Sequence, residues 1–240
     1  GVVRQPAASP DGRRIVCTDG RWIYMSGADA AGGAGTPIPL EGMTIGAVDT
    51  PVFDADGLRI LFGCFVDGGR WDICSVAGEG GAVADLTAGV LPSDWDEQRP
   101  SVSADGRYLA FDAADGVSDD PARAPAASDI FVLDRQTGMP RRVTDDPAVD
   151  RFPSFFPDGR TILFRSERDG NSELYTVGMD GKGVRRRTDD AAYDAYGTVS
   201  PDGRTIAFQS SRGGHDDVFV LDVATGVVAG VTDGLRAYRE

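Results

Sequence analysis

The stretch FPDGRTILF (residues 156–164) decides the fold, because the chain carries this pattern five times. Each copy joins an Asp-Gly turn to a short apolar run, which is a strong local signal for a β-hairpin. The turn aspartates follow one another at spacings of 45, 49, 53 and 44 residues, the period of a four-stranded propeller blade. The other copies are SPDGRRIVC (9–17), DADGLRILF (54–62), SADGRYLAF (103–111) and SPDGRTIAF (200–208).

One repeat contains four strand-like runs separated by turns. In the fourth repeat these runs are RFPSFF (151–156), RTILFRS (160–166), ELYTVGM (173–179) and VRRRTDD (184–190). No segment sustains apolar residues at helical spacing, so we predict an all-β chain. The prediction is a single β-propeller domain of five four-stranded blades, with repeats at approximately 1–42, 43–89, 90–146, 147–190 and 191–240.

The charge balance and the apolar runs exclude two classes of partner. The chain has 38 acidic and 24 basic residues, and its net charge of −14 has the wrong sign for binding nucleic acid. The apolar runs are too short to cross a bilayer, so we expect no membrane insertion. The segment GVVRQPAASP (1–10) lacks the pattern of a signal peptide. Gly1 is not a natural start, however, so the earlier removal of a signal peptide stays open as an alternative.

The three cysteines occupy slots that other repeats fill with core residues. Cys17 takes a slot that holds phenylalanine in the other four repeats, Cys74 takes an aromatic slot, and Cys64 takes the slot of a small residue. We therefore expect all three to act as small hydrophobic residues in the core. A Cys64–Cys74 bridge between neighbouring strands is the alternative.

Two irregular loops single out one face of the predicted propeller. Residues 88–100 lead into the third repeat and residues 115–129 interrupt it, and both loops should rise from the face opposite the Asp-Gly turns. Trp95, set among acidic residues, is the predicted aromatic platform for a ligand. We expect no resident cofactor; a Ca²⁺ ion held by acidic side chains on this face is the alternative.

Acidic residues recur at the start of the predicted innermost strands. Glu97, Asp150 and Asp194 stand eight residues before their turn aspartates, and Asp49 stands one place later in its own repeat. A ring of carboxylates at the mouth of the central channel could bind Ca²⁺, a basic peptide or sugar hydroxyls. The alternatives are that each acid caps a loop of its own blade, or that the acidity only keeps the protein in solution.

The repeat motif resembles that of a known family. Residues 166–190 (SERDGNSELYTVGMDGKGVRRRTDD) and 210–234 are similar to the WD40-like (PD40) repeats of the TolB-type β-propeller. Such propellers usually have six blades, so the resemblance leaves open that the chain is a fragment of a six-bladed ring. It also implies a periplasmic or secreted setting, and it does not specify an activity. If the five blades form a closed ring, Gly1 and Glu240 should lie close together.

The predicted function is that of a non-catalytic, monomeric scaffold. Its loop-rich face and channel mouth should bind a protein, a peptide or a carbohydrate. An enzyme is not supported, because His215 is the single histidine and the chain lacks a GxSxG nucleophile elbow. The alternatives are a glycan-active propeller enzyme of lyase or glycosidase type, and an accessory propeller domain of a peptidase.

Overall fold

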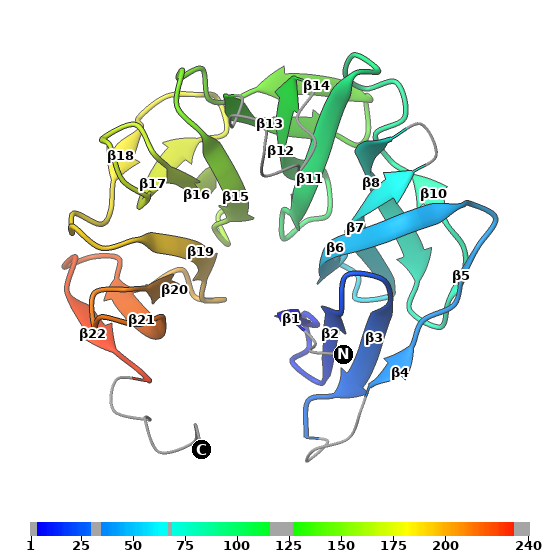
Figure 1. The fold of residues 1–240 in the computed structure, drawn as a ribbon, viewed down its shortest axis with the longest axis horizontal. Helices are drawn as coiled ribbons and strands as arrows, with labels where there is room; N and C mark the ends of the chain where they lie inside the picture. Colours follow the sequence, from blue (N-terminus) through cyan, green and yellow to red (C-terminus); the bar gives the residue numbers. More distant parts are fainter. Residues whose placement is uncertain (1–3, 30–34, 67–68, 116–126, 233–240) are drawn as a thin grey trace.

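Five four-stranded antiparallel sheets follow one another around a central axis in the order of the sequence (Figure 1). The structure is a computed structural model that describes residues 4–29, 35–66, 69–115 and 127–232. Within the described residues every regular element is a β-strand, and no helix is present that could span a membrane. The predicted all-β fold with five four-stranded blades is confirmed.

Within each blade the strands run from the innermost to the outermost in chain order. A short parallel pair, β5 (Leu40–Glu41) and β9 (Gly81–Ala82), lies outside the five blades. The blades are β1 (Arg4–Ala8), β2 (Arg14–Thr18), β3 (Ile23–Gly27) and β4 (Thr36–Pro37); β6 (Ile45–Phe53), β7 (Arg59–Val66), β8 (Arg70–Ala77) and β10 (Ala84–Asp85); β11 (Trp95–Val102), β12 (Tyr108–Asp115), β13 (Ser128–Asp134) and β14 (Met139–Arg142); β15 (Asp150–Phe155), β16 (Thr161–Ser166), β17 (Glu173–Gly178) and β18 (Arg185–Arg186); and β19 (Asp194–Val199), β20 (Thr205–Ser210), β21 (Asp217–Asp222) and β22 (Val228–Gly230).

The repeated Asp-Gly turns join the first two strands of each blade. In the fourth blade Oδ1 of Asp158 accepts hydrogen bonds from the amides of Arg160 and Thr161, both at 2.8 Å. Gly159 follows with φ of 62°, a left-handed conformation that glycine adopts without steric cost. The Asp-Gly sequence therefore suits the local conformation of the backbone, which explains why it predicts the hairpin so well.

The hydrophobic core lies between neighbouring blades. Phe164 and Tyr175 of the fourth blade pack against Ala110 and Ile130 of the third, and the same two-on-two arrangement recurs at the other junctions. The second to fifth blades thus present a pair of mostly aromatic side chains to the preceding blade, and the first to fourth blades present an aliphatic pair to the following one. The corresponding sets are Phe62 and Cys74 on Val16 and Ile23; Phe111 and Phe131 on Leu61 and Ile73; and Phe208 and Phe219 on Leu163 and Leu174.

Strand contacts join each blade to the next from the first to the fifth. In the part of the chain that the structure describes, no comparable contacts join the fifth blade to the first. Cys17, expected in the core, is only partly buried, because among the described residues no other blade makes strand contacts with the side of the first blade that its slot faces. Gly1 and Glu240 lie outside the described residues, so their predicted proximity stays a prediction.

Candidate functional site

Two of the predicted acids open the innermost strands of the last two blades, where each forms a buried ion pair. Asp150 and Asp194 are fully buried. Their Oδ2 atoms lie 2.9 Å from Nη2 of Arg168 and 2.7 Å from Nη2 of Arg212, respectively. Burial raises the pKa of both carboxyl groups, and the neighbouring guanidinium and serine hydroxyl groups oppose that rise.

Each of these ion pairs fastens a loop to the innermost strand of the same blade. Arg168 lies in the β16–β17 loop, and its Nε donates a hydrogen bond of 2.8 Å to Oγ of Ser166. Its guanidinium stacks over the rings of Phe164 and Tyr175 at 5.4 and 5.0 Å. We call this Asp-Arg-Ser unit the loop latch. The fifth blade repeats it with Asp194, Arg212 and Ser210.

Acids at the start of the third strands form a separate set of ion pairs. Asp129 lies 2.5 Å from Arg142 and Glu173 lies 2.9 Å from Arg186, and both arginines belong to the outermost strands. Each of these ion pairs lies within a single blade.

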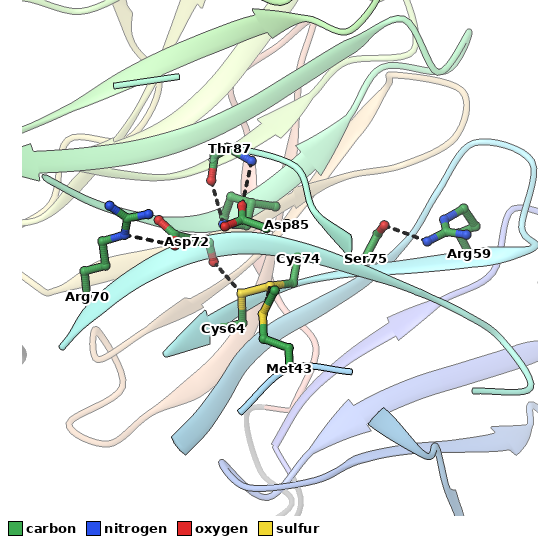
Figure 2. The surroundings of a disulfide bond; sticks show 10 residues. Met43, Arg59, Cys64, Arg70, Asp72, Cys74, Ser75, Asp85 and Thr87 are labelled. Carbon is green, nitrogen blue, oxygen red and sulfur yellow. Dashed lines mark hydrogen bonds and ion pairs between the residues drawn. A yellow bond between two sulfur atoms is a disulfide. The ribbon is translucent and has the colours of Figure 1, made fainter. Parts of the chain in front are cut away.

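Among the described residues, Glu97 lies in a different arrangement from Asp150 and Asp194. Ala113 takes the place of the latch serine, and the carboxyl group of Glu97 instead meets that of Asp72 from the second blade. Burial and the hydrogen bond with Asp72 raise the pKa of Glu97 to about 9. Asp85 also adds negative charge, whereas Arg70 Nε, 3.0 Å from Asp72, partly compensates it (Figure 2). Glu97 therefore holds a proton at neutral pH.

The proton on Glu97 predicts a characteristic dependence of stability on pH. The pKa of Glu97 is about 4.3 in the unfolded chain and about 9 in the folded protein. The protonated carboxyl group therefore stabilises the fold fully below pH 4, and this stabilisation is lost as pH rises through 9. Glu97→Gln should remove this loss, which we expect to be about 2–4 kcal/mol between pH 5 and 9. Urea unfolding at pH 5, 7 and 9 measures it.

The control for this prediction is Asp158→Asn. The amides of the turn lower the pKa of Asp158, and its contribution changes only in acid. Asp72, Asp85 and Arg70 are retained in both variants, so any difference in slope belongs to Glu97. Equal slopes in the wild type and in Glu97→Gln would contradict the assignment.

Trp95 and Asp49 make different contacts from the other predicted residues. Trp95 is partly buried and packs edge-on against Phe131, with ring centres 5.8 Å apart. Asp49 lies in β6, opposite Gly63 of β7. Within the described chain no hydrogen bond or ion pair joins any two of Trp95, Asp49, Glu97, Asp150 and Asp194. Most of the 115–129 loop lies outside the described residues.

The structure also corrects the interpretation of the cysteines. Cys64 and Cys74, expected to be unpaired core residues, are both fully buried and form a disulfide that joins β7 to β8 (Figure 2). The two positions are diagonal neighbours in the antiparallel pair, with Cα atoms 5.8 Å apart, which suits a disulfide. Sequence slots alone could not distinguish a buried thiol from a buried disulfide.

A set of residues that the sequence reasoning missed lies on the innermost strands. Each of these strands has a bulge at which one residue other than glycine adopts a left-handed backbone, with φ between 44° and 58°. Each stands six residues before the turn aspartate, and in four of the five blades a proline follows, which itself disfavours this conformation. The five bulge residues are Gln5, Thr50, Arg99, Phe152 and Tyr196.

The repeated proline is the signal that could have revealed these bulges. Proline in a β-strand is confined to edges and bulges, and Pro6, Pro51, Pro100 and Pro153 recur at one position of the innermost, edge strands. A left-handed backbone at a residue other than glycine costs about 1–3 kcal/mol, and such strain is concentrated at functional sites.

Three of the bulge residues meet in one stack. The guanidinium carbon of Arg99 lies 4.6 Å from the ring centre of Phe152, and the ring of Tyr196 meets Phe152 edge-on at 4.6 Å. Asp112 holds the stack in place, because its carboxylate accepts hydrogen bonds from Arg99 at 2.8 Å and from the amide of Phe152 at 3.1 Å. The guanidinium carbon of Arg165 also lies over the Phe152 ring, 5.7 Å from its centre. We call these five residues the inner-strand cluster.

Within the inner-strand cluster, access differs between the arginines and the rings. Arg99 and Arg165 are buried, Phe152 is partly buried, and Tyr196 is 46% exposed. The innermost strands that carry the bulges surround the axis of the propeller (Figure 1). The cluster therefore combines an exposed tyrosine ring with buried arginines.

Comparisons with known proteins agree with this architecture. Residues 122–238 match a family model described as "TolB beta propeller domain". The structure is similar to that of a putative TolB from Agrobacterium tumefaciens, with a TM-score of 0.79 and 24% identity over 95% of this chain and 80% of that one. The chain has the fold of a TolB-type β-propeller.

Sequence similarity to named TolB proteins covers only part of this TolB-type propeller. A stretch of 55 residues is 42% identical to the Tol-Pal system protein TolB of Bordetella pertussis, and covers 22% of this chain and 13% of that protein. The match thus spans a small part of that relative's length.

The TolB-type fold is shared with proteins of other function. An oligogalacturonate lyase from Vibrio parahaemolyticus is similar in structure, with a TM-score of 0.64 and 18% identity over 95% of this chain and 64% of that one. At this identity the similarity shows the fold alone, so function has to be argued from the side chains.

Proposed function

We propose that this TolB-type propeller is a non-catalytic scaffold that binds a segment of another protein at the inner-strand cluster. The observation that carries the proposal is the left-handed residue that recurs at one position of all five innermost strands. The bulge recurs in every repeat, but the side chain at its left-handed position differs from blade to blade. Three of these side chains form one stack of two aromatic rings and an arginine. Aromatic and arginine side chains are enriched where proteins bind proteins.

Two further observations support this proposal. The name of the Bordetella relative assigns that protein to the Tol-Pal system, and we extend a role in a protein assembly to this chain. Glu97 and Asp72 are buried and hydrogen-bond to each other, whereas the two carboxyl groups of a glycosidase are about 5–10 Å apart around the substrate. This pair therefore does not favour the glycan-active alternative.

We also propose a periplasmic or secreted setting for the chain. The buried Cys64–Cys74 disulfide supports it, because structural disulfides persist in oxidising compartments and are rare in the cytosol.

The experiment is a binding array of peptides and glycans, read with and without Ca²⁺, followed by titration calorimetry on the strongest ligand. Phe152→Ala/Tyr196→Ala should weaken binding by about tenfold or more, because it removes the accessible rings of the stack. The control is Leu58→Ala, an exposed residue beside an Asp-Gly turn. Unchanged affinity in the double variant would refute the proposal. Binding of glycans alone would refute the part of the proposal that names a protein as the partner.

The same array tests the ligand role predicted for Trp95, Asp49, Glu97, Asp150 and Asp194, which stays a prediction. Asp150 and Asp194 are fully buried in loop latches. We therefore expect their asparagine variants to affect the stability of the fold more than the affinity for the ligand. A Ca²⁺ dependence that disappears in Asp150→Asn/Asp194→Asn would instead support a carboxylate site.

A further inference from the structure

Arg187 stands in the fourth blade where the other four blades have an aliphatic residue. Its backbone amide donates a hydrogen bond of 2.8 Å to the carbonyl of Leu174, as the amide of Val143 does to the carbonyl of Ile130 at 2.7 Å in the third blade. The same backbone bond recurs in every blade, so the positions are equivalent in the structure as well as in the sequence. The equivalent residues are Ile38, Leu86, Val143 and Val231. A residue that departs from the repeat in this way is expected where it has a function of its own.

The charge of Arg187 is not neutralised by a neighbouring acid. Among the described residues neither Arg187 nor Arg185 forms an ion pair, and the Nε of Arg187 is buried without a hydrogen-bond acceptor. Arg186, between them, pairs with Glu173 and Asp189, each at 2.9 Å. Burial and the positive charge of Arg185 lower the pKa of Arg187. A buried donor without an acceptor costs free energy, so this side chain is prepared for an acceptor that a ligand supplies.

Arg185 and Arg187 line a groove of about 270 Å³ on the outer strands of the fourth blade. Arg185 is paired with Thr176 across β17 and β18, and Thr176 is paired with Leu163 across β16 and β17. Paired residues lie on the same face of a sheet, and Leu163 packs against the fifth blade, so these side chains lie on the side that faces the fifth blade. Gly183 also lines the groove, and a Cβ atom added to it would meet no atom within 4 Å, so the groove is open there.

Two carboxyl groups near the groove lie at its turn end and already accept hydrogen bonds. Asp158 accepts one of 2.7 Å from the hydroxyl group of Thr161, which lines this end. Asp180 accepts one of 3.1 Å from the amide of Lys182, and its Oδ1 lies beside Gly178. Neither carboxyl group forms an ion pair with Arg185 or Arg187 among the described residues. The positive charge is therefore concentrated at the other end of the groove.

The donors at this arginine end suit a phosphate group. A guanidinium group presents its N–H donors in a planar fork that matches the oxygen atoms of phosphate. The two uncompensated positive charges match a phosphate dianion better than a carboxylate, which carries one negative charge. The hydroxyl group of Thr176 lies on the same face as Arg185 and is a third potential donor.

We propose that Arg185, Arg187 and Thr176 form a binding site for a phosphate dianion, either inorganic phosphate or a phosphate monoester. The phosphate oxygens accept hydrogen bonds from both guanidinium groups, including the buried Nε of Arg187. The site lies on the outer strands of one blade, whereas the inner-strand cluster lies on the innermost strands. The inference therefore does not depend on the proposed function.

Titration calorimetry at pH 8 and constant ionic strength tests the site with three probes. Inorganic phosphate, glucose 1-phosphate and vesicles that contain phosphatidic acid distinguish free phosphate, a sugar phosphate and a lipid headgroup as the source. Arg187→Leu should weaken binding by about tenfold or more. It installs the residue that the second blade has at this position, Leu86, so the variant should fold. The matched control is Arg141→Gln, which changes the equivalent of Arg185 in the third blade and should leave the affinity unchanged.

Thermal unfolding gives a second readout of the same site. Phosphate, compared with chloride at equal ionic strength, should raise the Tm of the wild type and of Arg141→Gln but not that of Arg187→Leu. Binding of any of the three probes that is lost in Arg187→Leu supports the proposal and identifies the source of the phosphate. The proposal is overturned if no probe binds, if Arg187→Leu binds as tightly as the wild type, or if acetate binds as tightly as phosphate.

Discussion

Phe164→Ala is expected to lower the free energy of unfolding by about 3–5 kcal/mol. The ring is fully buried between the third and fourth blades, and it packs against Tyr175 with ring centres 5.8 Å apart. Its partners across the junction include Ala110, which is too small to move into the cavity that the substitution leaves. Equilibrium unfolding in urea, followed by fluorescence, measures the change.

Cys17→Ala is the matched control, because it changes the same repeat slot in the first blade. Cys17 is partly buried and its side chain is small, so the loss should stay below about 1 kcal/mol. Similar losses in the two variants would mean that the junction between blades is not the dominant core.

The second large effect is expected at the loop latch of the fourth blade. Arg168→Ala leaves the carboxylate of Asp150 fully buried without its cation, which should cost about 3–5 kcal/mol at pH 7. The pKa of Asp150, already raised by burial, should rise further in this variant, so the loss should shrink as pH falls toward 5. Urea unfolding at both pH values measures it.

The double variant Arg168→Ala/Asp150→Asn separates the ion pair from packing. It removes the charge as well as the cation, so it should regain part of the stability that Arg168→Ala loses. The guanidinium also stacks on Phe164 and Tyr175, and that part of the loss should remain. Equal stability of the single and double variants would show that the charge on Asp150 is unimportant.

Most of the fold was predictable from the sequence because its signals are local. An Asp-Gly turn needs only its own backbone, and the five copies report the same hairpin independently. The interblade core was also predictable in outline, since the slot of Phe164 is aromatic in four repeats. What the sequence could not specify is the 41% exposure of Val218, because its place in the repeat is the same as that of the buried Leu174.

The candidate site was predictable only in part. The recurrence of Asp150 and Asp194 was visible, but their burial depends on Arg168 and Arg212, which stand 18 residues further along the chain. The Cys64–Cys74 disulfide depends on a strand register that slots do not give. The bulges had a sequence signal in their prolines, yet the conclusion that Phe152 and Tyr196 touch requires the packing of two blades.

The bulges imply that the side chains around the axis can be changed while the turns and the interblade core stay the same. The same left-handed backbone carries Gln5, Thr50, Arg99, Phe152 and Tyr196, so it tolerates amide, hydroxyl, cationic and aromatic side chains alike. Fixing the turns and the interblade core while randomising these five positions would give a combinatorial library on a constant backbone. Selection from such a library could redirect the propeller to new ligands, much as variable loops do on a fixed immunoglobulin framework.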